Sequence, residues 1–166
     1  MTAGEGGALP ERTRFLADAM LGRLARWLRV LGYDTAYDAL LPDSALVALA
    51  GRERRVLLTR DRHLLRELRP PGAFEVRSDV PLEQLREVID ALALVPPPEL
   101  FTRCLVCNAV LDEVPSGEVA AVVPLASREL PGPVRRCPEC GRVYWPGSHV
   151  RRMRRALEGA LRGWLR

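Results

Sequence analysis

The chain has 166 residues and a mass of 18.5 kDa, the size of one domain or of a small domain with an appendage. Its 48% hydrophobic residues are enough to build a core, which excludes a fully disordered protein. The net charge is +4, and all 25 basic residues are arginines, so a polyanionic partner is allowed but not required. No apolar run reaches the length of a membrane span, and residues 1–9 lack the features of a secretory signal. We therefore expect a cytoplasmic protein without a membrane partner.

Residues 1–12 are small, polar and glycine-rich, which predicts a disordered tail. From residue 13 onward, short apolar segments alternate with segments of helical period. The pattern predicts strands at 14–17, 34–37, 55–59 and 74–77, and helices at 20–31, 43–50, 61–68 and 81–94. Such alternation over residues 13–95 predicts an α/β domain with a mainly parallel sheet. In the first helix, leucines form one face, and Arg23, Arg26 and Arg29 form the opposite, solvent-facing side.

Residues 96–98 are three prolines, which predict a stiff linker to a second unit at 99–166. This second unit contains two C-x-x-C pairs and short β-like pieces such as residues 119–123. It ends in a basic helix that begins at about residue 150.

The four cysteines, Cys104, Cys107, Cys137 and Cys140, have the spacing of two zinc knuckles. Four thiolates complete a tetrahedron, so the sequence predicts a closed, structural zinc site, with His149 not among the ligands. A disulfide and a redox role remain as alternatives.

Acidic residues follow the predicted strands. Asp18, Asp61 and Asp79 come after the first, third and fourth strands, and Asp38 and Asp43 follow the second. Because the carboxyl ends of parallel strands face one crevice, we expect these carboxylates to lie near one another and to bind Mg²⁺ or Mn²⁺. Ions in such a cleft support phosphodiester hydrolysis. The alternative is that Asp18, Asp43 and Asp61 are helix caps and that Asp79 is a turn residue.

Several long motifs resemble the Mut7-C ribonuclease domain family over roughly residues 13–153. They are FLADAMLGRLARWLR at 15–29, LGYDT at 31–35, LLTRDR at 57–62, VRSD at 76–79, RCLVCN at 103–108 and CPECGRVYWPGSH at 137–149. The resemblance implies a PIN-like nuclease fold followed by a zinc ribbon. It also implies a ribonuclease whose acidic residues Asp18, Asp43, Asp61 and Asp79 hold Mg²⁺ or Mn²⁺.

The same resemblance suggests that Thr59 and Arg60 contact a phosphate, although a strand-end hydroxyl and a solvated charge explain them equally well. The ribbon and the basic helices would bind RNA through Arg23, Arg26, His149, Arg151 and Arg152, and Tyr144 and Trp145 would stack on bases. Solvated helix faces, core packing and a surface histidine are the alternatives. A non-catalytic RNA- or protein-binding adaptor and a PIN-type toxin are the rival functions.

Overall fold

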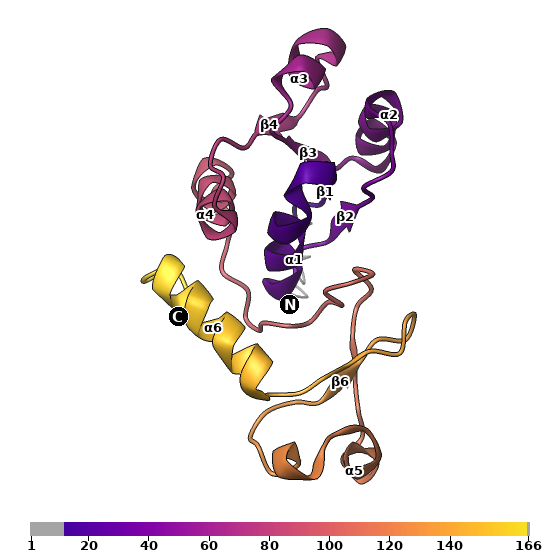
Figure 1. The fold of residues 1–166 in the computed structure, drawn as a ribbon, viewed down its shortest axis with the longest axis vertical. Helices are drawn as coiled ribbons and strands as arrows, with labels where there is room; N and C mark the ends of the chain where they lie inside the picture. Colours follow the sequence, from indigo (N-terminus) through magenta and orange to yellow (C-terminus); the bar gives the residue numbers. More distant parts are fainter. Residues whose placement is uncertain (1–11, 166) are drawn as a thin grey trace, which may run out of the picture.

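The computed structural model describes residues 12–165, so the predicted tail lies outside the described part except for Arg12. A four-stranded parallel sheet with helices on both faces is followed by a small antiparallel sheet and a final helix (Figure 1). The predicted α/β class and parallel sheet are thus confirmed. The elements of the first part are β1 (Phe15–Ala17), η1 (Ala19–Leu21), α1 (Gly22–Val30), β2 (Thr35–Tyr37), α2 (Asp43–Glu53), β3 (Val56–Thr59), α3 (Arg62–Leu68), β4 (Ala73–Glu75) and α4 (Pro81–Ala91).

The strand order of the large sheet is β2-β1-β3-β4. The chain therefore moves outward from β1 in one direction and from β3 in the other. In the register of the sheet, Ala17 pairs with both Tyr37 and Leu58, and Thr59 pairs with Glu75. The adjacent strands β1 and β3 thus form the topological switch point, and ligands of open α/β sheets bind in the crevice at the carboxyl ends of such strands.

Both faces of the sheet are buried. Phe15 and Leu58 pack toward α1 and α4, whereas Leu16 and Leu57 pack toward α2 and α3. All four side chains are fully buried. A sheet covered on both faces needs apolar residues at successive positions, which is why its strands read as continuous apolar runs rather than as alternating patterns.

The helix boundaries follow local chemistry. Gly32 adopts φ +78°, a conformation that residues with a side chain rarely adopt. It lies two residues after the last residue of α1 and turns the chain out of the helix. The carboxylate of Asp61 accepts hydrogen bonds from two backbone amides of the first turn of α3. Pro81 is the first residue of α4, where its missing N–H is not needed. The predicted helix at 20–31 is divided, because its first turn is the 3₁₀ helix η1.

The second part contains β5 (Asp112–Glu113), η2 (Ser116–Glu118), α5 (Val119–Val122), η3 (Leu125–Ser127), β6 (Arg135–Arg136) and β7 (Val143–Tyr144). The three strands form an antiparallel sheet in the order β5-β6-β7. The expectation of a β-like piece at 119–123 was wrong. Val123 closes a helical turn on Val119, since two alanines lie between the valines and prolines at 115 and 124 interrupt ladder pairing on both sides.

The final helix, α6 (Ser148–Ala160), runs back to the first part of the chain and packs beside α4 (Figure 1). Its buried residues Met153 and Leu157, with Leu161 just beyond it, join the core cluster formed by β1, α1 and α4. The indole N–H of Trp164 donates to the carbonyl of Leu94 at 3.1 Å. Within residues 12–165, no helix is long and apolar enough to cross a membrane.

Arg55 joins three strands at the amino edge of the large sheet. Its guanidinium donates to the Asp34 carboxylate at 2.6 Å and to the Phe15 carbonyl at 3.2 Å, and its Nε donates to Glu53 at 2.6 Å. The side chains of Arg55 and Asp34 are only 10% and 20% exposed. Burial alone would raise the pKa of Asp34, but hydrogen bonds from Arg55 and Asn108 hold that pKa below its ordinary value.

Replacing this arginine with an apolar residue of similar length tests the clamp. Arg55→Met leaves the largely buried carboxylate of Asp34 without its cation, and we expect a loss of about 2 kcal/mol in unfolding free energy, measured by urea titration at neutral pH. The matched control is Arg86→Met, which breaks the exposed 3.8 Å pair with Asp90. That loss should stay below about 0.5 kcal/mol. Equal losses in the two variants would contradict a structural role for Arg55.

Candidate functional site: an acidic sheet edge and a four-cysteine centre

The acidic edge is the set of carboxylates that follow the carboxyl ends of the large sheet. Asp18 comes directly after β1, and Asp61 comes two residues after β3, its neighbour in the sheet. Asp79 follows β4, and Asp43 is the first residue of α2. The predicted positions therefore fall at one edge of the sheet, with Asp18 and Asp61 flanking the switch point.

A single hydroxyl links the Asp18 carboxylate to the backbone of Asp61 at the switch point. Thr59 is fully buried, and its Oγ1 donates to Oδ2 of Asp18 and accepts from the backbone N–H of Asp61 at 2.9 Å. Asp18 is 6% exposed and also accepts from the amides of Met20 and Arg60, at 2.9 and 3.2 Å. Of the two roles predicted for Thr59, these bonds correspond to the strand-end hydroxyl. In this structure, Thr59 positions the carboxylates.

The remaining carboxylates are more open. The guanidinium of Arg60 forms an ion pair with Asp79, whose side chain is 84% exposed. The loop before Asp79 is held from α4, because Glu87 accepts from the amides of Arg77 and Ser78, both at 2.8 Å. Asp43 is exposed and is not a cap, since the N-cap position of α2 is occupied by a proline.

Asp18 and Asp61 do cap helices, as one of the two alternatives predicted. Asp61 Oδ1 accepts from the amides of His63 and Leu64 at 2.7 and 3.1 Å. Within the described residues, the four acidic positions do not bring three ligand atoms within 4.8 Å of one another. The carboxylates of Asp18, Asp61 and Asp79 are instead bonded to protein donors.

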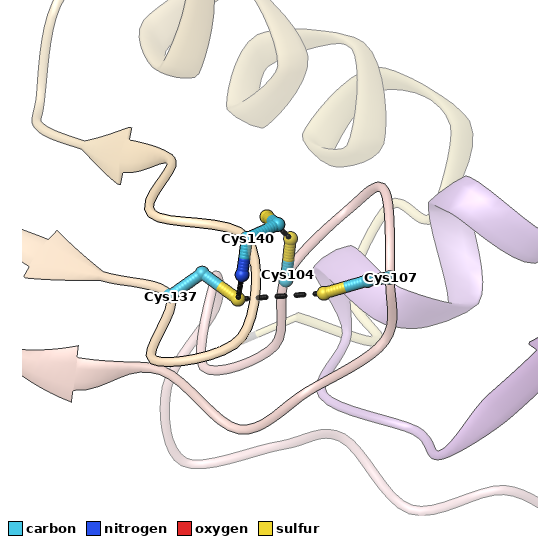
Figure 2. A group of neighbouring side chains, drawn as sticks. All are labelled: Cys104, Cys107, Cys137 and Cys140. Atoms are coloured by element: carbon cyan, nitrogen blue, oxygen red, sulfur yellow. Dashed lines mark hydrogen bonds between the residues drawn. The ribbon is translucent and has the colours of Figure 1, made fainter.

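The four cysteines lie close enough together to hold one metal ion, with all Sγ atoms within 4.8 Å of one another (Figure 2). The Sγ atoms of Cys104 and Cys140 are 3.5 Å apart, and those of Cys107 and Cys137 are 3.4 Å apart. These separations are far longer than a disulfide bond of about 2.05 Å. They approach the separation of about 3.8 Å that four thiolates have around one zinc ion, given Zn–S bonds near 2.3 Å. The donor set and its geometry therefore fit tetrahedral zinc.

Both C-x-x-C turns have the same backbone construction. The amide of the residue after the second cysteine donates to the carbonyl of the first, from Asn108 at 3.0 Å and from Gly141 at 2.9 Å. These two residues have φ +69° and +74°. Asparagine and glycine are the residues that tolerate this left-handed conformation best, which is the reason that they occupy equivalent positions in the two turns.

Tyr144 orients one of the sulfurs. Its hydroxyl accepts from the amide of Leu105 at 3.0 Å and lies 3.2 Å from Sγ of Cys104. Burial disfavours the Cys104 thiolate, but hydrogen bonds from knuckle amides and from Tyr144 outweigh it and lower the pKa of Cys104 to about 6. The pKa of Cys107 rises to about 12, because desolvation and the neighbouring thiols disfavour a second negative charge. A divalent cation removes that conflict, since it favours all four thiolates.

The first knuckle is bonded directly to the large sheet through Asn108. Its side-chain oxygen accepts from the amide of Thr35 in β2 at 2.9 Å, and its side-chain nitrogen donates to Asp34 at 2.7 Å. In the sequence, Asn108 is marked only as the last residue of the RCLVCN motif at 103–108. Its second role depends on a contact across 73 positions of the chain, which no local pattern signals.

Arg29 is the clearest difference from the sequence prediction. It was expected on the solvent face of α1, but it is 5% exposed. Its Nη1 donates to the carbonyls of Leu105 and Val106, both at 3.0 Å, and its Nε donates to the carbonyl of Thr35 at 2.9 Å. Helix periodicity places Arg29 on the polar face correctly, but the first knuckle covers that end of the face. Burial lowers the pKa of Arg29, and the thiolate of Cys104 opposes that shift.

The other predicted RNA contacts divide into two groups. The guanidinium of Arg26 lies 3.1 Å from Nε2 of His149, and both residues line one surface groove together with Arg23. Arg151 lies on α6 beside a different pocket, which Trp145 also lines. Arg152 is exposed on the same helix. The structure thus brings Arg23, Arg26 and His149 together from distant parts of the chain.

Purified protein should carry about one zinc per chain, because four thiolates enclose the centre. Elemental analysis measures this directly, and removal of the zinc with a strong chelator should lower the melting temperature, since metal binding supplies folding free energy to a ribbon this small. A zinc-free protein with mapped disulfides among these cysteines would contradict this prediction.

A substitution in the first turn separates metal binding from docking. Asn108→Gly keeps the positive φ but removes the bonds to Thr35 and Asp34, so we expect unchanged zinc content and a loss of about 1–2 kcal/mol in unfolding free energy. The control is Gly141→Asn in the second turn, where the added side chain meets open space and asparagine is one of the few residues that tolerate the φ of +74°. It should cost less than about 1 kcal/mol, because a non-glycine residue at this φ pays a small strain. If Asn108→Gly is as stable as the control, the docking role is wrong.

Comparison with protein families matches residues 13–157 to the Mut7-C RNAse domain. Comparisons with curated proteins and with solved structures gave no match. The match covers both the acidic edge and all four cysteines, and it includes most of α6. Together with the sheet, the switch point and the four-cysteine centre described above, it shows that the chain belongs to the Mut7-C RNAse domain family.

Proposed function

We propose that this chain is a ribonuclease that hydrolyses RNA phosphodiester bonds at its acidic edge, with Mg²⁺ or Mn²⁺ held by Asp18, Asp43, Asp61 and Asp79. The observation that carries the proposal is the pair of hydrogen bonds by which the Thr59 hydroxyl donates to the Asp18 carboxylate and accepts from the Asp61 amide, in a chain of a ribonuclease family. In this proposal the sheet is PIN-like, and the four-cysteine unit is a zinc ribbon that helps to bind RNA.

The donor chemistry of the edge suits a hard cation. Carboxylate oxygens are the protein ligands that Mg²⁺ and Mn²⁺ prefer. Mg²⁺ usually keeps several waters and is bound by one or two carboxylates together with substrate phosphates, so it does not require three carboxylates packed within a ligand-ligand distance. Asp18 and Asp61 would supply those carboxylates, and Asp43 and Asp79 would add negative charge at the rim.

A bound cation would activate a water molecule and stabilise the leaving oxygen of the phosphodiester. The chain contributes orientation and charge. Thr59 fixes the positions of Asp18 and of the Asp61 turn through buried hydrogen bonds. Arg60, whose side chain is 25% exposed, places a positive charge beside Asp79, where phosphate oxygens would be bound.

The second candidate is an adaptor that binds RNA or protein without cleaving it. It is favoured by one observation: Asp18 and Asp61 already cap helices, so their presence has a structural explanation. The two candidates make opposite predictions for a change that removes a carboxylate charge and keeps the cap.

Asp61→Asn is the sharpest such change, because an asparagine oxygen accepts the same two amide bonds that Oδ1 of Asp61 accepts now. If Asp61 holds a cation, cleavage of labelled RNAs with Mn²⁺ should fall by about 100-fold or more, while the melting temperature stays within a few degrees. Asp18→Asn should also abolish cleavage. It should in addition lower stability, because its amide nitrogen cannot accept the bonds from Thr59 and Arg60.

The control is Asp90→Asn, which removes an exposed carboxylate near the far end of α4 and should leave cleavage unchanged. Equal cleavage by wild type, Asp61→Asn and Asp18→Asn would mean that the acidic edge is not the active site. Tight RNA binding by a wild-type protein that cleaves none of the RNAs would favour the adaptor.

A further inference from the structure

A surface groove of about 370 Å³ lies between α1, the start of α4 and the start of α6. α1 contributes Arg23 and Arg26, and α6 contributes His149. None of the residues of the described chain that line the groove is acidic. Two carboxylates of α4 are engaged outside this lining, since Glu83 accepts from the Ser78 hydroxyl at 2.7 Å and Glu87 accepts from the loop amides. Within the described residues, neither Arg23 nor Arg26 forms an ion pair, so the lining of the groove carries a net positive charge.

Its floor is apolar rather than polar. Trp27, Leu82 and Met153 line it, and Val80, which also lines it, is 49% exposed. A duplex would use only the arginines, because its bases are stacked inside the helix. Unpaired bases need apolar or aromatic side chains to lie against, and phosphates need arginines. The combination fits one strand of RNA.

The groove also opens toward the acidic edge. Val80 directly follows Asp79, which pairs with Arg60, and the amide of Arg60 donates to Asp18 at 3.2 Å. Arg23 is five residues beyond Asp18, separated from it by the single turn η1. An RNA strand that leaves the groove at Val80 therefore has only a short stretch of protein surface to cross before it reaches the acidic edge.

We infer that this groove binds the segment of single-stranded RNA next to the bond that is cut, with phosphates on Arg23 and Arg26 and bases against Trp27 and Leu82. The placement of the groove next to the cleaved bond rests on the proposed function, whereas RNA binding in the groove does not depend on it. At 370 Å³, the groove is at the lower end of the range of about 300–1,000 Å³ for small-ligand sites, so it takes one or two nucleotides.

The test is the affinity for a fluorescently labelled 12-nucleotide single-stranded RNA, measured by anisotropy at several salt concentrations without added Mg²⁺ or Mn²⁺. The groove variant is Arg23→Gln with Arg26→Gln. We expect it to weaken binding roughly tenfold and to reduce the salt slope by about 1.4, because each phosphate contact on a single strand contributes about 0.7. A duplex of equal length should bind the wild type more weakly than the single strand.

The matched control is Arg52→Gln with Arg66→Gln, two exposed arginines of α2 and α3 on the opposite face of the sheet, with the same change in net charge. It should alter the affinity less than twofold. The inference is overturned if the groove variant and this control bind equally, if the duplex binds as tightly as the single strand, or if the wild type binds no RNA.

Crosslinking with 4-thiouridine RNA gives an independent location. We expect crosslinked peptides from α1 or from the start of α6, whereas crosslinks confined to residues around Trp145, in the separate pocket beside Arg151, would overturn the inference. Groove-dependent binding without any cleavage would contradict the proposed ribonuclease while it supports the groove. If RNA cleavage requires Asp61 but RNA binding does not require Arg23 and Arg26, the ribonuclease proposal is supported and the groove is contradicted.

Discussion

A buried guanidinium holds the two parts of this protein together. Arg29 donates to two carbonyls of the first cysteine turn and to one carbonyl of β2, and it has almost no contact with solvent. A charge in such a place is tolerated only when its hydrogen bonds are made. The turn presents these carbonyls only in its folded form, and four thiols this close together favour that form when a metal neutralises them. We therefore expect the position of α1 against the cysteine turn to depend on a metal ion bound by the four cysteines.

This dependence extends to the RNA-binding residues that we propose. Arg23 and Arg26 lie on the same helix as Arg29, about two turns and one turn before it, so the helix that carries the groove charges is the helix fixed by the first knuckle. The acidic edge is organised by another buried polar group, the Thr59 hydroxyl. The ribbon thus supports one end of α1, and the other end adjoins the carboxylates of the sheet.

Much of this arrangement can be predicted from sequence, because it depends on local rules. The alternation of apolar and helical segments predicted a mainly parallel sheet, Asp61 was one of the predicted helix caps, and the cysteine spacing predicted two zinc knuckles. Long-range contacts are what the sequence could not predict. Arg29 looks like its neighbours Arg23 and Arg26 on the helix, and only the knuckle 76 residues away distinguishes it.

Local residue preferences also gave a wrong prediction where the tendencies toward helix and toward strand were nearly equal. Valines at 119, 122 and 123 favour strands, but Ala120 and Ala121 favour a helix, and the prolines at 115 and 124 cannot donate to a ladder on either side. The carboxylates show a related limit. A sequence can place them at the same edge of a sheet, but whether their oxygens face a cation or a backbone amide is decided by side-chain geometry.

The return of α6 to the first part of the chain has a consequence for how such proteins can be divided or recombined. Leu157 is fully buried in the cluster that also contains the inner faces of α1 and α4. A fragment cut at the prolines 96–98 would leave that apolar surface open to water and prone to association. A ribbon transplanted without α6 would lose the contacts that α6 makes with α4 and with the core cluster. The smallest unit that can be exchanged between proteins by recombination therefore includes the sheet, the ribbon and the final helix together.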